Sequence, residues 1–213
     1  MSYFFKGIER ARLTKLCAVR DAFDNLSNIL SLVELVNTCS HCSIERYDKD
    51  FDFVIFSGEY SRALVKKSDG YFTMSMPFQI VDDGRLYFTY DEFELEVNGQ
   101  FISVLRNAIA TSKLGGNSHE EVICSLVDSF GIGVHEATNY YDAFATLAMQ
   151  DHGYFRFDDD AKNQNGTIHP RYHFDFFFKE ASSVKVGTDG LIDIECFYAL
   201  FDGSRAKHYL REF

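Results

Sequence analysis

Two short stretches toward the C-terminal end combine residue types that transfer protons, bind anions or bind metals. These polar residues are Arg156 and Asp158 in the first stretch, and His169, Arg171, His173 and Asp175 in the second. In both stretches, charged side chains or imidazoles alternate with aromatic ones, which is the two-residue period of a β-strand. We therefore expect the polar residues to share one face of an antiparallel hairpin closed by the polar loop 160–167.

Used without a metal, this face would act on a phosphodiester or nucleotide. We expect His169 or His173 to be the acid or base, because an imidazole titrates near neutral pH. A register that places Asp158 opposite His169 would give that imidazole a carboxylate partner, and Arg156 would stabilise charge on the phosphate. The residues predicted to bind the substrate are Arg171 and Lys185.

The same spacing also suits a metal, although no particular cofactor follows from it. A strand rises about 3.3 Å per residue, so His173 and Asp175 would lie about 6.6 Å apart and could bind one divalent ion, with Asp158 from the neighbouring strand. His169 would lie roughly 13 Å from His173 on a straight strand. Pro170 favours strand entry, so His169 can belong to the loop and fold back. A charge-compensated structural network is the third interpretation.

The rest of the chain separates into helical and strand-like regions. Apolar residues at helical spacing predict helices over 8–36, 101–111, 120–130, 135–149 and 192–201. Between 51 and 100, Asp-Gly and Asn-Gly steps separate β-like runs and predict an antiparallel meander with strands at 51–56, 63–67, 71–81 and 85–97. Asp21 or Asp24 is expected to cap a helix, and Ser118 with Glu121 resembles a capping box.

The C-terminal region completes an α+β architecture. We expect the hairpin strands near 154–159 and 171–178, a short third strand at 184–187, and a final helix that covers the aromatic face of the hairpin. The order is N-terminal helices, antiparallel β meander, central helices, and C-terminal β-hairpin and helix. We interpret the chain as a single α+β domain over 1–213, with a possible division into 1–150 and a site-bearing part at 151–213.

Composition limits the classes of partner. The 213 residues carry a net charge of −11, which repels polyphosphates at long range, so we expect no non-specific binding to duplex DNA. A protein partner is expected, and RNA or a nucleotide remains a candidate ligand. No apolar run approaches the roughly 20 residues that span a bilayer, so we expect no membrane association. The five cysteines and the absence of a signal-peptide pattern predict reduced thiols and a cytoplasmic location.

Two resemblances begin at these residues. The run 155–160, the segment His169-Pro170-Arg171-Tyr172-His173, and Lys185 with the closing helix resemble an uncharacterised bacterial family, domain of unknown function 2290, over about the last third of the chain. The order Arg-x-Asp, His, His is also similar to that of small toxins from toxin–antitoxin pairs thought to attack RNA. Those toxins usually carry another histidine where this chain has Asp175.

These observations lead to two hypotheses from different classes. The first is a bacterial protein of the toxin–antitoxin or phage-defence type, a nuclease or phosphodiesterase that uses the His/Arg/Asp face on a phosphodiester or nucleotide. The second is a non-catalytic acidic interaction module, such as an antitoxin, an immunity protein or a subunit of a complex. Nucleotide-binding Rossmann, P-loop and serine-hydrolase motifs do not occur in the sequence.

Overall fold

The computed structural model describes residues 1–17, 19–44, 50–58, 61–115, 118–150, 153–166, 168–176 and 184–208. The helices are α1 (Arg10–Leu13), α2 (Ala22–Thr38), α3 (Gly99–Lys113), α4 (His119–Phe130), α5 (Val134–Met149) and α6 (Ile194–Phe201), with 3-10 turns η1 (Ser40–Cys42) and η2 (Asp91–Phe93). The strands are β1 (Ser2–Phe5), β2 (Ser43–Ile44), β3 (Phe53–Phe56), β4 (Arg62–Lys67), β5 (Gly70–Ser75), β6 (Gln79–Asp82), β7 (Leu86–Tyr90), β8 (Leu95–Glu96), β9 (Phe155–Asp159), β10 (Tyr172–Phe176) and β11 (Val184–Gly187).

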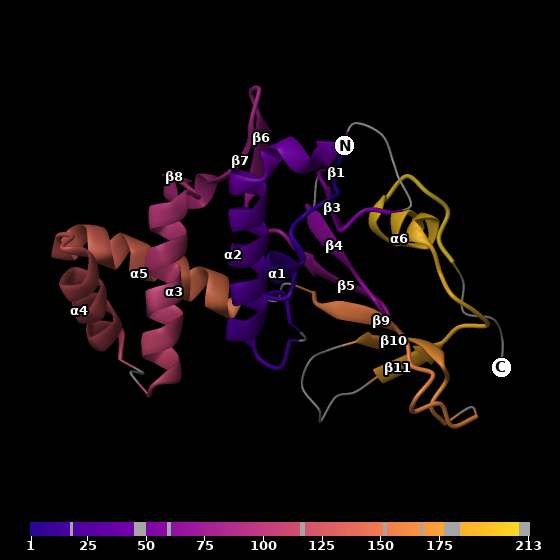
Figure 1. Ribbon diagram of the computed structural model, residues 1–213. Helices are drawn as coiled ribbons and strands as arrows, with labels where there is room; N and C mark the ends of the chain where they lie inside the picture. The colour runs from indigo at the N-terminus through magenta and orange to yellow at the C-terminus, as the bar shows by residue number, and fades with distance from the viewer. Residues whose placement is uncertain are drawn as a thin grey trace.

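Within these residues, the strands form two antiparallel sheets. An eight-stranded sheet has the order β11-β10-β9-β5-β4-β3-β1-β2, and β6-β7-β8 form a three-stranded sheet. Helices α2 to α5 lie on one side of the large sheet and α6 lies on the other (Figure 1). The α+β class predicted from the sequence is therefore confirmed. No described helix combines the length and the apolar character that crossing a membrane requires.

Each face of the large sheet buries its own hydrophobic core. The core under α2, α3 and α5 includes Phe72 of β5 and Tyr154, which precedes β9. The core under α6 gathers the aromatic residues of the hairpin, with the Phe174 and Phe197 rings 6.4 Å apart and those of Phe155 and Phe201 6.1 Å apart. The prediction that the last helix covers the aromatic face of the hairpin is confirmed.

The predicted helix over 8–36 is wrong in its middle, because the described residues between α1 and α2 are not helical. The side-chain amide of Asn28 binds the backbone of this segment: its Oδ1 accepts from Cys17 N at 3.1 Å, and its Nδ2 donates to Cys17 O at 2.8 Å. The backbone N–H and C=O of Cys17 thus find hydrogen-bond partners in a side chain, without helical hydrogen bonds. The Asp21 carboxylate accepts from Asp24 N at 2.7 Å, which confirms Asp21 as a helix cap.

The predicted meander is divided between the two sheets. Pro77 interrupts the run predicted at 71–81, so that β5 joins the large sheet and β6 begins the small one. The run at 85–97 is broken by η2, after which Glu94 adopts a positive φ of 52°. Asn98 caps α3 by accepting from Gln100 N and Phe101 N, where the sequence had suggested a hairpin turn.

The predictions for the central and C-terminal elements agree with the structure more closely. The Ser118–Glu121 capping box is present at the start of α4. The hairpin is antiparallel, and β11 is the expected third strand. Residues 177 and 178, at the end of the predicted strand, lie outside the described residues.

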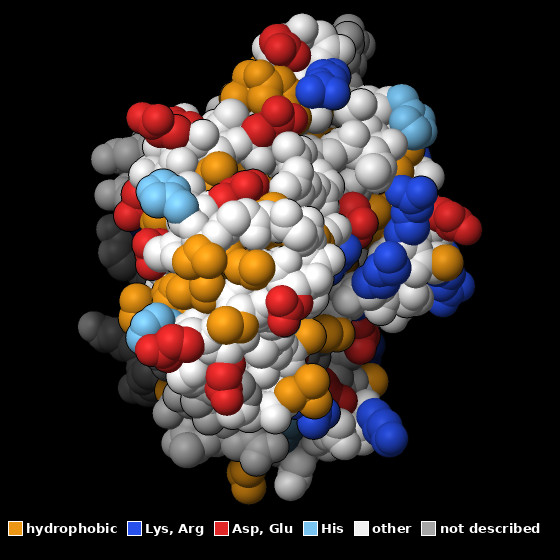
Figure 2. Space-filling view, turned by 90° about the vertical axis from the view of Figure 1, so that its left-hand side faces the viewer, with side chains coloured by type: hydrophobic (Ala, Val, Ile, Leu, Met, Phe, Trp, Pro, Cys, Tyr) orange, Lys and Arg blue, Asp and Glu red, His pale blue; other side chains and the backbone are white. Residues whose placement is uncertain are grey.

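The end of the molecule formed by α4 and α5 faces the viewer in Figure 2. Acidic side chains are scattered there among hydrophobic and neutral ones, while Lys and Arg gather mainly along one edge. This face therefore offers no broad basic surface to a polyphosphate, as expected for a net charge of −11.

Gly70 sets how closely β5 approaches β9, and its replacement tests the sheet order. It lies opposite Asp158 with φ +144°, and a Cβ there would lie 1.9 Å from the carbonyl oxygen of Phe157. We expect Gly70→Ala to lower the free energy of unfolding by at least about 2 kcal/mol in urea titrations. Gly84→Ala is the matched control, because Gly84 has a positive φ of 103° but open space around the new methyl group. Equal losses in both variants would contradict the close β5–β9 approach.

Candidate functional site

Three neighbouring strands assemble a polar face at one end of the large sheet. In the register of β9 and β10, His173 lies opposite Asp158, and Asp175 lies opposite Arg156. On the other side of β10, Asp175 lies opposite Lys185 of β11. Directly opposite residues of an antiparallel pair point to the same side, so these five residues share one face. We call them the polar face; the alternate residues Phe155, Phe157, Phe174 and Phe176 point toward α6.

Lys185 connects two members of the polar face. Its Nζ lies 2.8 Å from both carboxylate oxygens of Asp175 and 3.0 Å from Nε2 of His173. The other ring nitrogen of His173, Nδ1, lies 2.8 Å from the carbonyl oxygen of Pro170. A carbonyl only accepts, so this contact assigns the proton to Nδ1. The Lys185 ammonium only donates, so its contact with Nε2 requires a lone pair on that nitrogen. With a proton on Nδ1 and a lone pair on Nε2, the hydrogen bonds of His173 are those of a neutral imidazole.

Arg156 connects the two carboxylates. Its NH2 group donates to Asp175 Oδ2 at 2.5 Å, and its Nε lies 2.8 Å from Asp158 Oδ2. The second contact is an ion pair without hydrogen-bond alignment, because the buried Nε has no hydrogen-bond acceptor. With His173 neutral, the cations Arg156 and Lys185 balance the two aspartates, so the polar face carries no net charge.

The two carboxylates of the polar face have pKa values shifted in opposite directions. Burial raises the pKa of Asp158 above its usual value, and this effect exceeds the attraction of Arg156. Burial also acts to raise the pKa of Asp175, but hydrogen bonds from Lys185 and Arg156 outweigh it and lower the pKa. Neighbouring carboxylates whose pKa values are pushed apart are a common feature of acid–base sites, and they also occur in structural networks.

Access to the polar face is uneven. The side chain of His173 is 1% exposed and that of Asp175 9%, whereas Asp158 and Lys185 are each 27% exposed. Arg156, at 37%, is the most exposed, so solvent and ligands meet Arg156, Asp158 and Lys185 first. His173 can be reached only if one of its neighbours moves.

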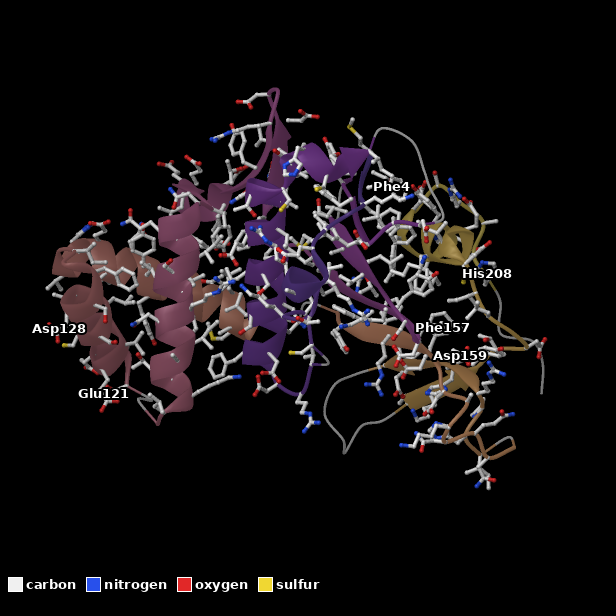
Figure 3. All side chains as sticks on the ribbon, viewed as in Figure 1. Phe4, Glu121, Asp128, Phe157, Asp159 and His208 are labelled. Atoms are coloured by element: carbon white, nitrogen blue, oxygen red, sulfur yellow. The ribbon has the colours of Figure 1, made fainter. Side chains whose placement is uncertain are left out.

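His169 and Arg171 lie outside the polar face, in the loop that enters β10. His169 Nε2 lies 3.1 Å from Asp160 Oδ2, and the His169 ring centroid is 5.0 Å from that of His173. Pro170 thus lets His169 fold back, as the sequence suggested. Arg171 lies outside the strand and pairs with Asp159, with Nε 2.6 Å from Oδ1, on the opposite side from the polar face. Figure 3 labels Asp159 beside this loop.

The register considered from the sequence, with Asp158 opposite His169, differs from the observed one by four residues. In the structure Asp158 lies opposite His173, and Arg156 lies opposite Asp175. The reason is the loop: Asn165 forms an isolated bridge with His169, and β10 begins only after Pro170. Side chains alternate between the two sides of a strand, so a shift by an even number of residues keeps each side chain on its expected side and changes only which residues lie opposite each other.

Sequence reasoning missed the carboxylates that hold the two loop residues. Asp159 and Asp160 pair with Arg171 and His169, respectively. The acidic run 158–160 at the end of β9 was the available signal, but side-chain alternation assigned only Asp158 to the site. Lys179, a further lysine close to the hairpin in sequence, lies outside the described residues.

The ligand set predicted for a metal is brought together. Asp158, His173 and Asp175 each offer a ligand atom, and these atoms lie within 4.8 Å of one another. His173 Nε2 is 3.8 Å from Asp158 Oδ2 and 3.9 Å from Asp175 Oδ2. The three residues suit a divalent ion by type and position.

The opposite pKa shifts of the two aspartates predict opposite effects on stability. A lowered folded-state pKa means that Asp175 stabilises the fold above the usual carboxyl pKa, and that this stabilisation is lost as the pH falls through the folded-state pKa. The raised pKa of Asp158 has the reverse sign, so that its ionisation costs stability as the pH rises.

We therefore expect Asp175→Asn to lower the free energy of unfolding at pH 7 by about 2–3 kcal/mol, below the full cost of breaking a buried pair because Lys185 is partly exposed. This deficit should shrink below about pH 4. Asp158→Asn should not lower stability at pH 7. Urea unfolding at both pH values measures these effects, and equal losses for the two variants would contradict the assignment.

Comparison with known proteins gives no match: no family model matches the chain, and no curated protein or solved structure is significantly similar to it. The resemblances to domain of unknown function 2290 and to RNA-attacking toxins therefore stay predictions. The roles assigned to individual residues stay predictions as well, and they rest on the geometry of the polar face and of the His169 loop.

Proposed function

We propose that the protein acts on a phosphodiester or nucleotide at the C-terminal hairpin, with His169 as the proton-transfer group. The observation that supports this most directly is the His169–Asp160 pair, 3.1 Å apart, beside the polar face. A carboxylate on one ring nitrogen fixes the tautomer and leaves the other nitrogen to accept a proton. His169 would take the proton from the hydroxyl group that attacks phosphorus, while the bond from phosphorus to the leaving oxygen breaks and water supplies that oxygen with a proton.

The two histidines differ in their suitability for this role. The His169 side chain is 26% exposed, and Nδ1 has no hydrogen-bond partner among the described residues. His173 is 1% exposed, and both of its ring nitrogens are engaged, by Pro170 and by Lys185. We therefore assign direct proton transfer to His169 and a structural or ligand-binding role to His173.

The remaining groups suit the charge of a phosphate. Arg156 and Lys185 are partly exposed, 37% and 27%, and both donate to Asp175 in the absence of a ligand. Each has further N–H groups that can bind phosphate oxygens. Arg171, predicted to bind substrate, pairs with Asp159 on the other side of the hairpin, so it is the less suitable phosphate ligand.

The proposed cellular setting is the bacterial toxin–antitoxin or phage-defence one that the sequence resemblance implies, with the protein in the cytoplasm and a protein partner. A second function has an observation of its own. The cations of the polar face are already balanced by carboxylates, as expected for a structural network in an acidic interaction module. An antitoxin, immunity protein or complex subunit would need no catalytic group.

His169→Ala separates the two functions. We expect it to reduce cleavage of a single-stranded RNA oligonucleotide or a chromogenic phosphodiester by roughly 100- to 10,000-fold, the usual contribution of a general acid or base. Its cost in stability should stay below about 1 kcal/mol, because the side chain lies in a loop and is partly exposed. Initial rates and thermal melts, with and without Mn²⁺, measure both quantities.

Asp83→Asn is the control, because Asp83 is an exposed residue in the β6–β7 turn, far from the hairpin in sequence and in a different sheet. It should retain full activity and stability. A His169→Ala variant that melts normally and cleaves at the normal rate would refute the catalytic role. Lack of cleavage by the unaltered protein, or lack of toxicity in a bacterial host, would favour the interaction module.

A further inference from the structure

The Lys185 ammonium occupies a position that a metal ion would suit. It is the shared neighbour of both Asp175 oxygens and of His173 Nε2, at 2.8, 2.8 and 3.0 Å. Asp158 Oδ2 lies 3.8 Å from the same Nε2. We propose that a divalent cation, Zn²⁺ or Mn²⁺, binds to Asp158, His173 and Asp175 in place of this ammonium. The Lys185 side chain then turns outward.

The ligand atoms are close to the required separation. Ligand atoms around a tetrahedral zinc lie about 3.4 Å apart, given bonds of about 2.0–2.2 Å. The His173–Asp158 and His173–Asp175 distances are 3.8 and 3.9 Å, so each must shorten by about 0.5 Å. Rotation of the aspartate side chains supplies a movement of this size without a change in strand register.

His173 is already prepared as a ligand. Its Nδ1 hydrogen is held by the Pro170 carbonyl, which leaves Nε2 free of a proton and directed at the Lys185 ammonium. This outer hydrogen bond is the usual support of a metal-binding histidine. The support depends on Gly187, which lies opposite His173, since a Cβ there would approach Pro170 Cγ to 2.8 Å. Arg156 contacts the same Oδ2 atoms, by an ion pair to Asp158 and a hydrogen bond to Asp175, so each of these oxygens would bind the cation through a remaining lone pair.

Lys185 can leave its position between Asp175 and His173. It lies on β11, which is the edge strand, and its side chain is long, flexible and 27% exposed.

A divalent cation in place of the ammonium carries two positive charges instead of one, which strengthens the attraction to both carboxylates. One imidazole and two carboxylates match the preferences of Zn²⁺ and Mn²⁺. Three protein ligands also leave coordination positions for a phosphate oxygen or water, as in catalytic sites.

A role for this cation in catalysis rests on the proposed function, but its binding does not. A bound cation would polarise the phosphate, and the displaced Lys185 would bind a second phosphate oxygen. Metal binding is measured without substrate, so the metal site can be refuted without refuting the proposed function, and the reverse also holds. Loss of activity in His169→Ala tests the function, while the affinity for the metal alone tests the site.

The experiment titrates the full chain, freed of metal with a chelator, with ZnCl₂ and with MnCl₂ in a calorimeter. We expect one equivalent to bind to the unaltered protein. Lys185→Met should bind roughly tenfold more tightly or better, because the competing ammonium that holds the site in its closed form is gone. Asp158→Asn should bind at least roughly tenfold more weakly, because it loses a ligand. Asp83→Asn should bind as the unaltered protein does.

Two results would overturn the proposal. One is a Lys185→Met variant that folds and binds neither ion more tightly than the unaltered protein. The other is an Asp158→Asn variant that retains full affinity. If Lys185→Met does not fold, Asp158→Asn decides alone, because Asn matches Asp in size and the side chain of Asp158 is 27% exposed.

Discussion

The buried carboxylate of Asp175 determines how the last three strands align. Because its side chain is only 9% exposed, the carboxylate needs compensating charge, which it receives from one neighbour on each side, Arg156 of β9 and Lys185 of β11. A slip of one residue in either strand pair would turn a partner toward α6 and place a charge among the phenylalanine rings. This requirement fixes which side of the sheet these residues face, and together with the loop around Pro170 it sets the register of the hairpin.

The location of the site follows from where the helices end. Phe72 of β5 lies opposite Arg156, so the polar face continues the side of the sheet that α2, α3 and α5 cover. Tyr154 still belongs to that core, and two residues later the side chains become polar. The opposite side of the same strands stays apolar, because α6 covers it. One strand, β9, therefore completes a hydrophobic core at its beginning and a polar cluster at its end.

The sequence predicted those parts that depend on local pattern. Alternation of polar and aromatic residues was sufficient to place Arg156, Asp158, His173 and Asp175 on one face, because strand geometry fixes it. The register could not be predicted, since it depends on how the loop folds around Pro170. The contact of Lys185 with Asp175 likewise requires β11 to be the neighbour of β10, which pattern alone does not specify. Similarly, no local signal showed that the side chain of Asn28 would replace helical bonds near Cys17.

A balanced network and a latent metal site are compatible in this arrangement. A structural role for the ion pairs accounts for Asp175, whose pKa is lowered by its partners, but it accounts poorly for Asp158, whose pKa burial raises in spite of Arg156. A purely structural network gains nothing from a partly buried carboxylate that is unfavourable when ionised. A divalent cation beside Asp158 would favour its ionised form, and the resting ammonium of Lys185 keeps Asp175 and His173 satisfied until that cation binds. The feature that most favours a ligand at the polar face is the convergence of Asp158, His173 and Asp175, whose ligand atoms lie within 4.8 Å of one another.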